Sequence, residues 1–452
     1  MRRFALLALL ALLAACSTEP ATTPWAPGVV VPTARAANAR GLLDRRGLVH
    51  AHSVYSHDAC DNEPVKDGVR DPICFDDFHR GLCQSKHDFV MLTDHNDSFG
   101  STDITDLMLL KPERGDVAIA RNGAPVANRA MCPDGSTPLI LPGMESDTMP
   151  VGVEKHLLPD GQRGYYGESS STAIALLREA GAVILVAHTE NFTPEQLVAM
   201  PLDGFEMYNL HANTVIGAGA ALELLVMLSE MRPGLPHSDL AILPLWSEDP
   251  RYIETWGTVL SRGAHRVTTM GTDCHRNTFN ALLPDGERID SYRRMMMAFS
   301  NHLLLKPEAD GTFDDRHLKE ALKAGRVYGV LEEIGYAEGF DVTASSGGRT
   351  FEMGETGPVG ATILVKRPSI VGLALADTPV LTMRLLKARE GGFDEVASGT
   401  TGDLSFTTVA PGAYRAEVRV KPTHLTPFMG TFAQRVVATD FAWIYANPIY
   451  VE

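Results

Sequence analysis

The chain has 452 residues, of which 44% are hydrophobic and 21% charged, and its formal net charge is −16. This length is sufficient for two domains. The acidic excess disfavours nonspecific binding to nucleic acid or to anionic lipid, because both require a positive protein surface. A small anionic substrate remains compatible with this composition if a metal ion supplies the local positive charge.

The first 40 residues predict export and attachment to a membrane. Residues 4–15 form an almost purely apolar run after two arginines, too short to span a bilayer as a helix, which needs roughly 20 residues, and typical of a signal peptide. The run ends in Leu13-Ala-Ala-Cys16, which resembles the lipobox of bacterial lipoproteins and implies a lipid anchor on Cys16 at the end of a signal peptide over residues 1–16. An ordinary signal peptide cut nearby is the alternative. Residues 17–40, rich in Thr, Pro and Ala, predict a flexible tether.

Five cysteines remain beyond Cys16, and in an oxidising compartment some of them could form disulfides. An odd number leaves at least one cysteine unpaired. Three of the five lie between residues 58 and 84, a segment rich in Gly, Asp and Pro without periodicity, which a disulfide would stabilise. A zinc knuckle is disfavoured because no Cys-x-x-Cys occurs. The five cysteines are Cys60, Cys74, Cys83, Cys132 and Cys274.

Residues 47–53 predict a short strand that carries His50 and His52. Side chains two residues apart in a strand point to the same side, so the two imidazoles can meet at one point. That arrangement suits a metal ion, although such a pair in a loop is more often solvated.

Later segments repeat this arrangement, because each is an apolar run with a histidine or a carboxylate at its end. Predicted helices over residues 170–181, 216–230 and 249–261 lie between them. Strands that alternate with helices predict a parallel α/β, barrel-like domain whose strand ends meet at one edge. The residues at these ends are Asp94 and His95, Glu145 with His156 eleven residues later, His188, His211 after a strand over 203–209, and Asp273 with His275.

Each of these residues alone has an ordinary structural explanation. His188 could be a hydrogen-bonded histidine after a strand, and Glu145 a solvated loop carboxylate. The repetition argues against chance, since packing requires neither residue type at a strand end. Imidazoles and carboxylates without thiolates suit Zn, Mn or Fe, and they exceed what one ion can hold, so the sequence predicts two or three divalent metal ions.

Together these motifs resemble the PHP (polymerase and histidinol phosphatase) metallohydrolases over about residues 45–335. The resemblance implies a distorted (β/α)7 barrel, placed here at residues 41–335, with three metals at the carboxyl ends of the strands. The motifs that carry it are His50-x-His52, Thr93-Asp94-His95, Gly143-Met-Glu145, His156, Val186-Ala-His188 and Gly271-Thr-Asp273-x-His275.

The resemblance also implies how the ligands divide among three metals. The first metal would be held by His50, His52, Glu145 and Asp273. The second would be held by Glu145, His156 and His188. The third would be held by His95, His275 and one residue after the first motif. Here Ser56-His57-Asp58 stands where Ser-Asp-Gly is usual, so His57 or Asp58 could serve, and Asp58 is preferred because some family members carry this ligand one place later.

Two kinds of ester hydrolysis are compatible with the resemblance. The eleven-residue step from Glu145 to His156 is similar to the branch of small nucleotide and nucleic-acid phosphoesterases. An exported barrel with a β-rich tail is similar to the branch that includes a carbaryl hydrolase, which cleaves a carbamate. Clustered divalent ions would lower the pKa of a bridging water and supply hydroxide near neutral pH.

We expect a phosphoesterase first, a carboxylic or carbamate ester hydrolase second, and a noncatalytic surface-binding lipoprotein third. A serine hydrolase is disfavoured because no Gly-x-Ser-x-Gly occurs. A phosphate needs a cationic clamp, for which Arg276 is the candidate, although strand-like alternation after His275 could turn it away into a surface salt bridge. His211 is the candidate acid for the leaving group.

The last part of the chain predicts a separate β domain. Residues 314–325 predict a capped helix that ends the barrel domain. Short β runs over 361–366, 380–387, 412–420 and 441–451, separated by turn residues, then predict an antiparallel β-sandwich with little helix over residues 339–452. Structural support of the barrel is favoured over glycan binding, because the aromatic residues are not clustered.

Overall fold

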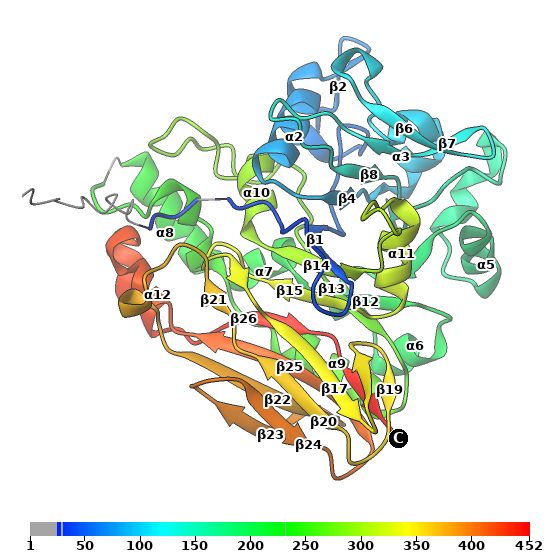
Figure 1. Ribbon diagram of the computed structural model, residues 1–452. Coiled ribbons are helices and arrows are strands. Elements are labelled where there is room, and N and C mark those ends of the chain that lie inside the picture. Colours follow the sequence, from blue (N-terminus) through cyan, green and yellow to red (C-terminus); the bar gives the residue numbers. More distant parts are fainter. Residues whose placement is uncertain (1–24, 29, 231) are drawn as a thin grey trace, which may run out of the picture.

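The computed structural model describes residues 25–28, 30–230 and 232–452, so the predicted signal peptide and Cys16 lie outside the described residues. The fold is mixed α/β, with one 13-stranded mixed sheet and a later four-stranded antiparallel sheet (Figure 1). The predicted α/β class and the later antiparallel sheet are therefore confirmed. The four-stranded sheet has the order β18 (Arg349–Glu352), β17 (Asp341–Ser346), β20 (Thr362–Lys366) and β24 (Leu404–Thr407).

The large sheet is built around β1 (Leu43–Leu48), which carries His50 and His52 just beyond its end. β1 pairs in parallel with β4 (Phe89–Met91), and β4 pairs in parallel with β8 (Leu139–Leu141). All side chains of β4 and β8 are buried, as expected for short parallel strands with uninterrupted apolar sequences. On its other side β1 pairs antiparallel with β14 (Ser300–Leu305).

Three strand pairs outside this sheet bring the ends of further strands close to the end of β1. An isolated bridge joins Gly143 to Val151, and another joins Ala51 to Cys274. These bridges connect the strands that precede the predicted site residues. The pairs are β5 (Asp94–His95) with β9 (Met144–Glu145), β10 (Met149–Val151) with β11 (Val183–Leu185), and β12 (Gly204–Asn209) with β13 (Val267–Gly271).

Two buried amide side chains join β13 to the large sheet. Asn301 accepts a hydrogen bond from Met270 N and donates one to Met270 O, both at 2.8 Å. Asn447 does the same for Thr268, again at 2.8 Å. Since buried backbone groups require partners, these amides replace the backbone pairing that a neighbouring strand would supply.

The large sheet crosses the predicted domain boundary. β15 (Val327–Val330) pairs with β14 on one side and with β26 (Phe441–Ala446) on the other. Val330, Leu385 and Trp443 belong to one hydrophobic core. The two predicted domains therefore share a sheet and a core. The remaining strands of the sheet are β6 (Val117–Arg121), β7 (Ala124–Arg129), β19 (Thr356–Gly357), β22 (Leu381–Arg389), β23 (Gly392–Gly399), β25 (Gly412–Val420) and β27 (Ile449–Val451).

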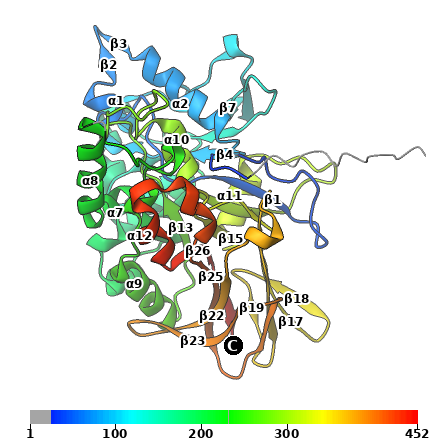
Figure 2. The same cartoon turned by 90° about the vertical axis from the view of Figure 1, so that its left-hand side faces the viewer.

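Three of the predicted helices begin at residues whose side chains cap them, whereas α8 (Ala218–Ser229), in the segment predicted over 216–230, begins after Gly217 without a side-chain cap. Ser170 accepts a hydrogen bond from Ala173 N at the start of α5 (Ser171–Glu179). Asp249 and Asp314 cap α9 (Pro250–Ser261) and α11 (Asp315–Lys323) in the same way. Figure 2 shows α9 on one side of the molecule together with α7 (Leu210–Ile216) and α8. The shorter α-helices are α1 (Ala59–Asn62), α3 (Asn96–Ser101), α4 (Ile104–Leu107), α6 (Pro194–Ala199), α10 (Tyr292–Ala298) and α12 (Ala433–Ala438).

The segment over residues 58–84 contains a 13-residue helix, α2 (Pro72–Gln84), where the sequence analysis found no periodicity. Asp71 caps this helix, and its buried residues Phe75, Phe78 and Leu82 lie on one face. Two disulfides, which the sequence left open as a possibility, connect Cys60 to Cys74 and Cys83 to Cys132, while Cys274 is free and buried. The first disulfide joins α1 to α2, so it holds this segment as predicted.

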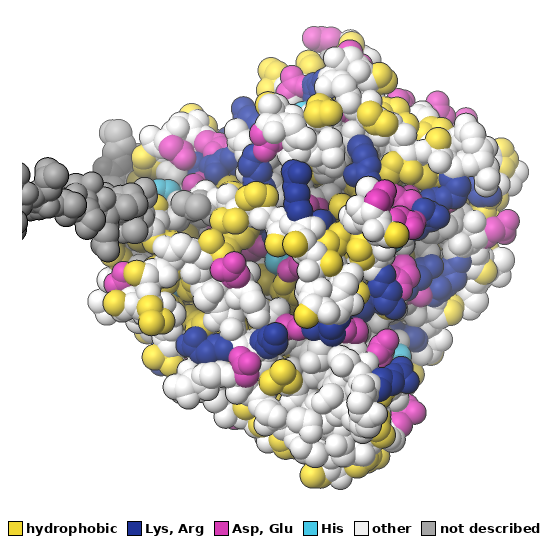
Figure 3. Space-filling model, in the orientation of Figure 1, with side chains coloured by type: hydrophobic (Ala, Val, Ile, Leu, Met, Phe, Trp, Pro, Cys, Tyr) yellow, Lys and Arg dark blue, Asp and Glu magenta, His cyan; other side chains and the backbone are white. Residues whose placement is uncertain are grey.

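The described part of the predicted tether lies against the body. Trp25 contacts the rings of His424 and Phe428, Thr33 donates a hydrogen bond to Asp88, and Arg40 pairs with two carboxylates. No helix in the described ranges is both long and apolar enough to cross a membrane. On the face in Figure 3, acidic and basic side chains alternate rather than form one large region of a single sign.

Candidate metal centre

The first two histidines meet as their spacing predicts. Both His50 and His52 are fully buried, and their Nε2 atoms lie 3.1 Å apart. Two carboxylates face this pair, one from Glu145 at the end of β9 and one from Asp273 after β13. Glu145 Oε2 lies 3.4 and 3.2 Å from the Nε2 atoms of His50 and His52, and Asp273 Oδ1 lies 3.2 and 3.3 Å from them. The four side chains surround one point and could hold a metal ion.

The second oxygens of the same carboxylates face other histidines. Glu145 Oε1 lies 3.1 Å from His188 Nε2. Asp273 Oδ2 lies 3.3 Å from His188 Nε2 and 3.4 Å from His211 Nδ1. Each carboxylate is therefore placed between two groups of imidazoles, which is the arrangement of a bridging ligand.

A third group includes Asp58. Its Oδ2 lies 3.0 Å from His95 Nε2 and 3.1 Å from His275 Nε2, and these side chains with His52 could hold a further ion. His57 points elsewhere, because its Nδ1 pairs with Asp97 Oδ1 at 3.0 Å and its side chain is 56% exposed. Of the two residues that the sequence left open, the structure brings Asp58 into the cluster.

Two carboxylates that the sequence patterns did not reveal contact histidines of the cluster. The buried Glu206 of β12 lies 2.6 Å from His50 Nδ1, and Glu190 lies 3.2 Å from His188 Nδ1. Such contacts set which ring nitrogen is free to bind a metal. Gly271 leaves the space that this requires, since a Cβ there would stand 1.8 Å from Glu206 Oε1. A carboxylate inside an apolar strand is the signal that could have revealed Glu206.

The electrostatics of the cluster favour a cation. Burial alone would raise the pKa values of Glu145 and Asp273, but the surrounding imidazoles hold both well below their usual range. Burial alone would lower the pKa of His50, but Glu206, Asp273 and Glu145 outweigh it and raise that pKa well above its usual value. Asp273 and Glu145 likewise raise the pKa of His188 to about 12. The ionised carboxylates thus favour the protonated form of the neighbouring imidazoles. A bound divalent cation can supply the same positive charge in place of these protons.

Two further observations fit a bound metal. Among the described residues, Asp273 Oδ1 and His275 Nε2 are buried and make no hydrogen bond of ordinary geometry, although donor or acceptor atoms lie 3.1–3.3 Å away. The nitrogen-to-oxygen distances of 3.1–3.4 Å around Glu145 and Asp273 are close to the roughly 3.4 Å that separates neighbouring ligands of a tetrahedral zinc ion. The donor set is therefore suited to divalent metals such as Zn, Mn or Fe.

His156 lies outside the cluster, contrary to the predicted role as a ligand with Glu145 and His188. Its Nε2 contacts Thr102 O at 2.9 Å, and its ring stacks on Tyr166 and meets the edge of Phe99. β10 causes this displacement, because it runs antiparallel to β11 and so carries the chain away from the strand ends before His156 is reached. Burial lowers the pKa of this histidine.

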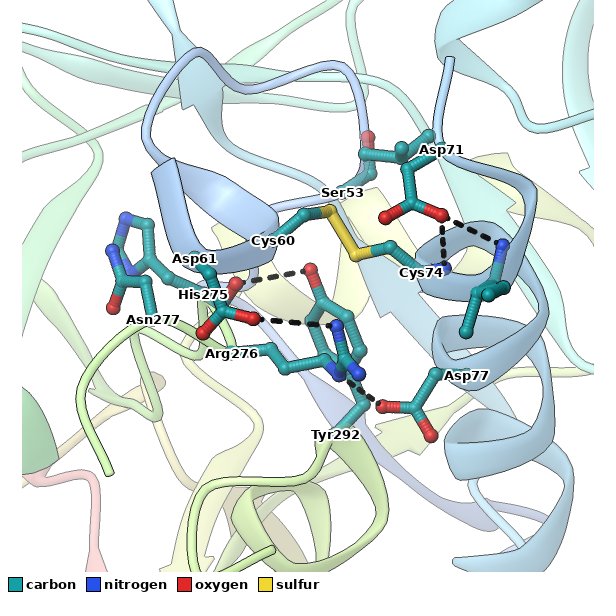
Figure 4. The surroundings of a disulfide bond; sticks show 12 residues. Ser53, Cys60, Asp61, Asp71, Cys74, Asp77, His275, Arg276, Asn277 and Tyr292 are labelled. Carbon is teal, nitrogen blue, oxygen red and sulfur yellow. Dashed lines mark hydrogen bonds and ion pairs between the residues drawn. A yellow bond between two sulfur atoms is a disulfide. The ribbon is translucent and has the colours of Figure 1, made fainter. Parts of the chain in front are cut away.

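Arg276 also points away from the cluster, so the predicted phosphate clamp is not in place. Its backbone adopts φ 57°, and its Nε lies 2.9 Å from Asp77 Oδ2 on α2. Figure 4 shows the guanidinium directed to Asp61 and Asp77 beside the Cys60–Cys74 disulfide, on the side opposite the His275 ring. Arg276 therefore forms a salt bridge, which is the alternative that the sequence left open for it.

Comparisons of the chain with protein-family models, with curated proteins and with solved structures found no match. The basis for a functional proposal is therefore the site itself. The structure brings together these predicted site residues: His50, His52, Asp58, His95, Glu145, His188, His211, Asp273 and His275.

Proposed function

We propose that the chain is a metal-dependent hydrolase of ester bonds with phosphoesters as its preferred substrates. The observation that carries this proposal is the placement of Glu145 and Asp273, each with its two oxygens facing different imidazoles. Two metal positions that share bridging carboxylates are typical of hydrolytic sites that act on phosphoesters. A structural zinc site, in contrast, needs only four ligands around a single ion.

The proposal includes a PHP-type architecture. The strand pairs and the bridges Gly143–Val151 and Ala51–Cys274 support a distorted (β/α)7 barrel, and the four-stranded sheet with the end of the large sheet supports a β-sandwich. In a barrel of this kind the site occupies the carboxyl ends of the strands, where these histidines and carboxylates lie.

The residues of the cluster have separate tasks in this proposal. When bound, divalent ions would lower the pKa of a water molecule and stabilise negative charge on the attacked ester. Glu206 and Glu190 orient His50 and His188 through their Nδ1 atoms. His50 is fully buried whereas the side chains of His95 and His188 are 28% and 31% exposed, so substrate reaches the cluster from their side.

Hydrolysis of a carboxylic or carbamate ester is the second candidate, and the position of Arg276 favours it. A phosphomonoester carries up to two negative charges and gains from a cationic clamp, but the Arg276 guanidinium already pairs with Asp77. A neutral ester has no such requirement. For a phosphoester, the bound metals rather than an arginine would therefore neutralise the negative charge of the substrate.

Export with a lipid anchor at Cys16 remains part of the proposal. The two disulfides are compatible with an oxidising compartment. A Cys16→Ser variant should leave the membrane fraction and keep its hydrolytic activity, and retention after a salt wash would require another anchor.

The test is elemental analysis combined with a matched set of p-nitrophenyl esters. We expect two or three metal ions per chain, and turnover of the phosphate ester that disappears after chelation and returns on reloading. His79→Gln serves as a control, because this histidine contacts Met131 O outside the cluster. One ion or fewer in the active protein would contradict the multinuclear site. Faster turnover of the acetate or carbamate would favour the second candidate, and a loaded protein without any turnover would favour a noncatalytic binding protein.

A further inference from the structure

The two shared carboxylates define a second metal position that lacks one of its predicted ligands. Its donors are His188 Nε2, Glu145 Oε1 and Asp273 Oδ2, with 3.1 and 3.3 Å between the imidazole nitrogen and the two oxygens. The resemblance gives the remaining place to His156, which instead contacts Thr102 O. The cluster therefore has one imidazole fewer from this segment than the resemblance implies.

We infer that His211 is a metal ligand that the resemblance does not supply, and that it binds an ion together with Asp273 and His275. This inference rests on the proposed function, because it concerns the metal centre of that site. His211 Nδ1 lies 3.4 Å from Asp273 Oδ2, the oxygen that also faces His188. A ring nitrogen of His211 and donor atoms of Asp273 and His275 lie close enough together to hold an ion.

The backbone around His211 supports this placement. Asn209 ends β12, accepts a hydrogen bond from Ala212 N and so caps α7. Its amide nitrogen also lies 3.2 Å from Glu206 Oε2 and 3.4 Å from Asp273 Oδ2. The first turn of α7, which carries His211, is thereby tied to the same carboxylate that the histidine faces.

The metal count distinguishes this role from that of a proton donor to the leaving group. His211 Nδ1 lies 3.4 Å from Asp273 Oδ2, and a histidine held in this way can still donate a proton from Nε2. Loss of such an acid would lower turnover and leave the metals in place, whereas loss of a ligand would remove an ion.

The experiment compares His211→Ala with His156→Ala, two histidines of which only one faces Asp273. After loading with Co²⁺ and removal of free metal, elemental analysis should show one ion fewer in His211→Ala than in the wild type, and an unchanged count in His156→Ala. His211→Cys adds a positive readout, because a thiolate bound to Co²⁺ produces a sulfur-to-metal charge-transfer absorption. The wild type supplies the background spectrum, and circular dichroism verifies folding of each variant.

Three results would overturn the inference in distinguishable ways. A full metal count in His211→Ala, or no charge-transfer absorption in a folded His211→Cys, would remove His211 as a ligand while leaving the hydrolase proposal intact. Loss of an ion from His156→Ala alone would restore the ligand set of the resembling family. Failure of the wild type to bind metal would remove the proposed function and this inference with it.

Discussion

Two groups of charged side chains lie next to each other, and the neighbouring residues His275 and Arg276 belong to one group each. In the group of Arg276, every cation meets a carboxylate. Arg276 Nε lies 2.9 Å from Asp77, and Arg288 lies 2.6 Å from Asp61 and 2.9 Å from Asp290. The charges in this arginine group are neutralised within the protein.

The group of His275 is built differently. Among the described residues, no lysine or arginine forms an ion pair with Glu145 or Asp273, whose ion-pair partners are all histidines. A group of paired charges supports the fold, whereas buried carboxylates whose ion-pair partners are all imidazoles could hold a cation from outside the chain.

The largest effect is expected from Glu145→Gln, which removes the charge of a carboxylate that faces two groups of imidazoles. The variant should lose more than one metal ion, and its activity should fall by more than the roughly ten- to hundredfold that changes outside the ligand set cost. Elemental analysis and kcat/KM measure this. Asp77→Asn, from the arginine group, is the control and should keep its metals. Loss of a single ion from Glu145→Gln would show that this carboxylate does not bridge.

Glu206→Gln should weaken metal binding less, by roughly ten- to hundredfold, because Glu206 contacts His50 Nδ1 rather than the metal. Competition with a chromophoric chelator measures the dissociation constant. Asp290→Asn is the matched buried carboxylate, paired with Arg288, and should not change it. Equal affinities in wild type and Glu206→Gln would mean that His50 keeps its orientation without this contact.

The Cys60–Cys74 disulfide connects the two groups. It lies two residues after Asp58, and Cys60 N donates to His275 O at 3.0 Å. The double variant Cys60→Ala/Cys74→Ala should lower the free energy of unfolding by about 3 kcal/mol through loss of a short cross-linked loop. It should also weaken the metal position formed by Asp58, His95 and His275. Urea unfolding and elemental analysis are the measurements, and a full metal count would show that Asp58 is held without the disulfide.

His302 provides a paired group whose charge can be removed by pH. Burial alone would lower its pKa, but Asp44 at 2.9 Å and Glu332 at 3.4 Å raise it to about 9. A raised histidine pKa contributes stability that is complete below pH about 6.5 and is lost as the pH rises through 9, amounting to about 3 kcal/mol. His302→Gln should therefore be destabilised relative to wild type at pH 6 and much less so at pH 10. A difference that does not change with pH would contradict this pairing.

The strand ends of the site could be predicted from sequence because the signal is local. Apolar runs end at Asp94–His95, Glu145 and Asp273–His275, and parallel strands bring such ends to one edge of a sheet. The capped helices α5, α9 and α11 could be predicted equally well. In each of them a capping residue, Ser170, Asp249 or Asp314, precedes apolar residues at helical spacing. Local patterns were sufficient for these elements.

The remaining features depend on contacts between distant segments. The direction of His156 follows from the antiparallel pairing of β10 with β11, which its own sequence does not reveal. Arg276 turns to α2 through a positive φ and an aspartate about 200 residues earlier in the chain. The pairing of β15 with β26 joins segments that the sequence assigns to separate domains. The many Gly, Asp and Pro residues of this segment also made the helical spacing of the apolar residues in α2 difficult to recognise from sequence.

Arg276→Ala should have the smallest effect on substrate preference. Its removal leaves Asp77, whose side chain is 6% exposed, with Arg80 as its remaining cation, so the free energy of unfolding should fall by only about 1.5 kcal/mol. Because the guanidinium faces α2, the ratio of kcat/KM for an aryl phosphate to that for the matching neutral ester should stay within about twofold. A true phosphate clamp would instead lower the phosphate rate alone by roughly ten- to hundredfold.

The decisive measurement is the pair of rates on one metal-replete preparation, with Asp77→Asn beside Arg276→Ala. If Arg276 belongs to the arginine group, both variants should lose stability and neither should change the substrate ratio, because each removes one half of the same ion pair. A selective loss of phosphate turnover in Arg276→Ala would mean that the side chain leaves Asp77 when substrate binds. Arg276 would then belong to the same group as His275 when substrate is bound. The arginine, together with the metals, would neutralise the charge of the phosphate.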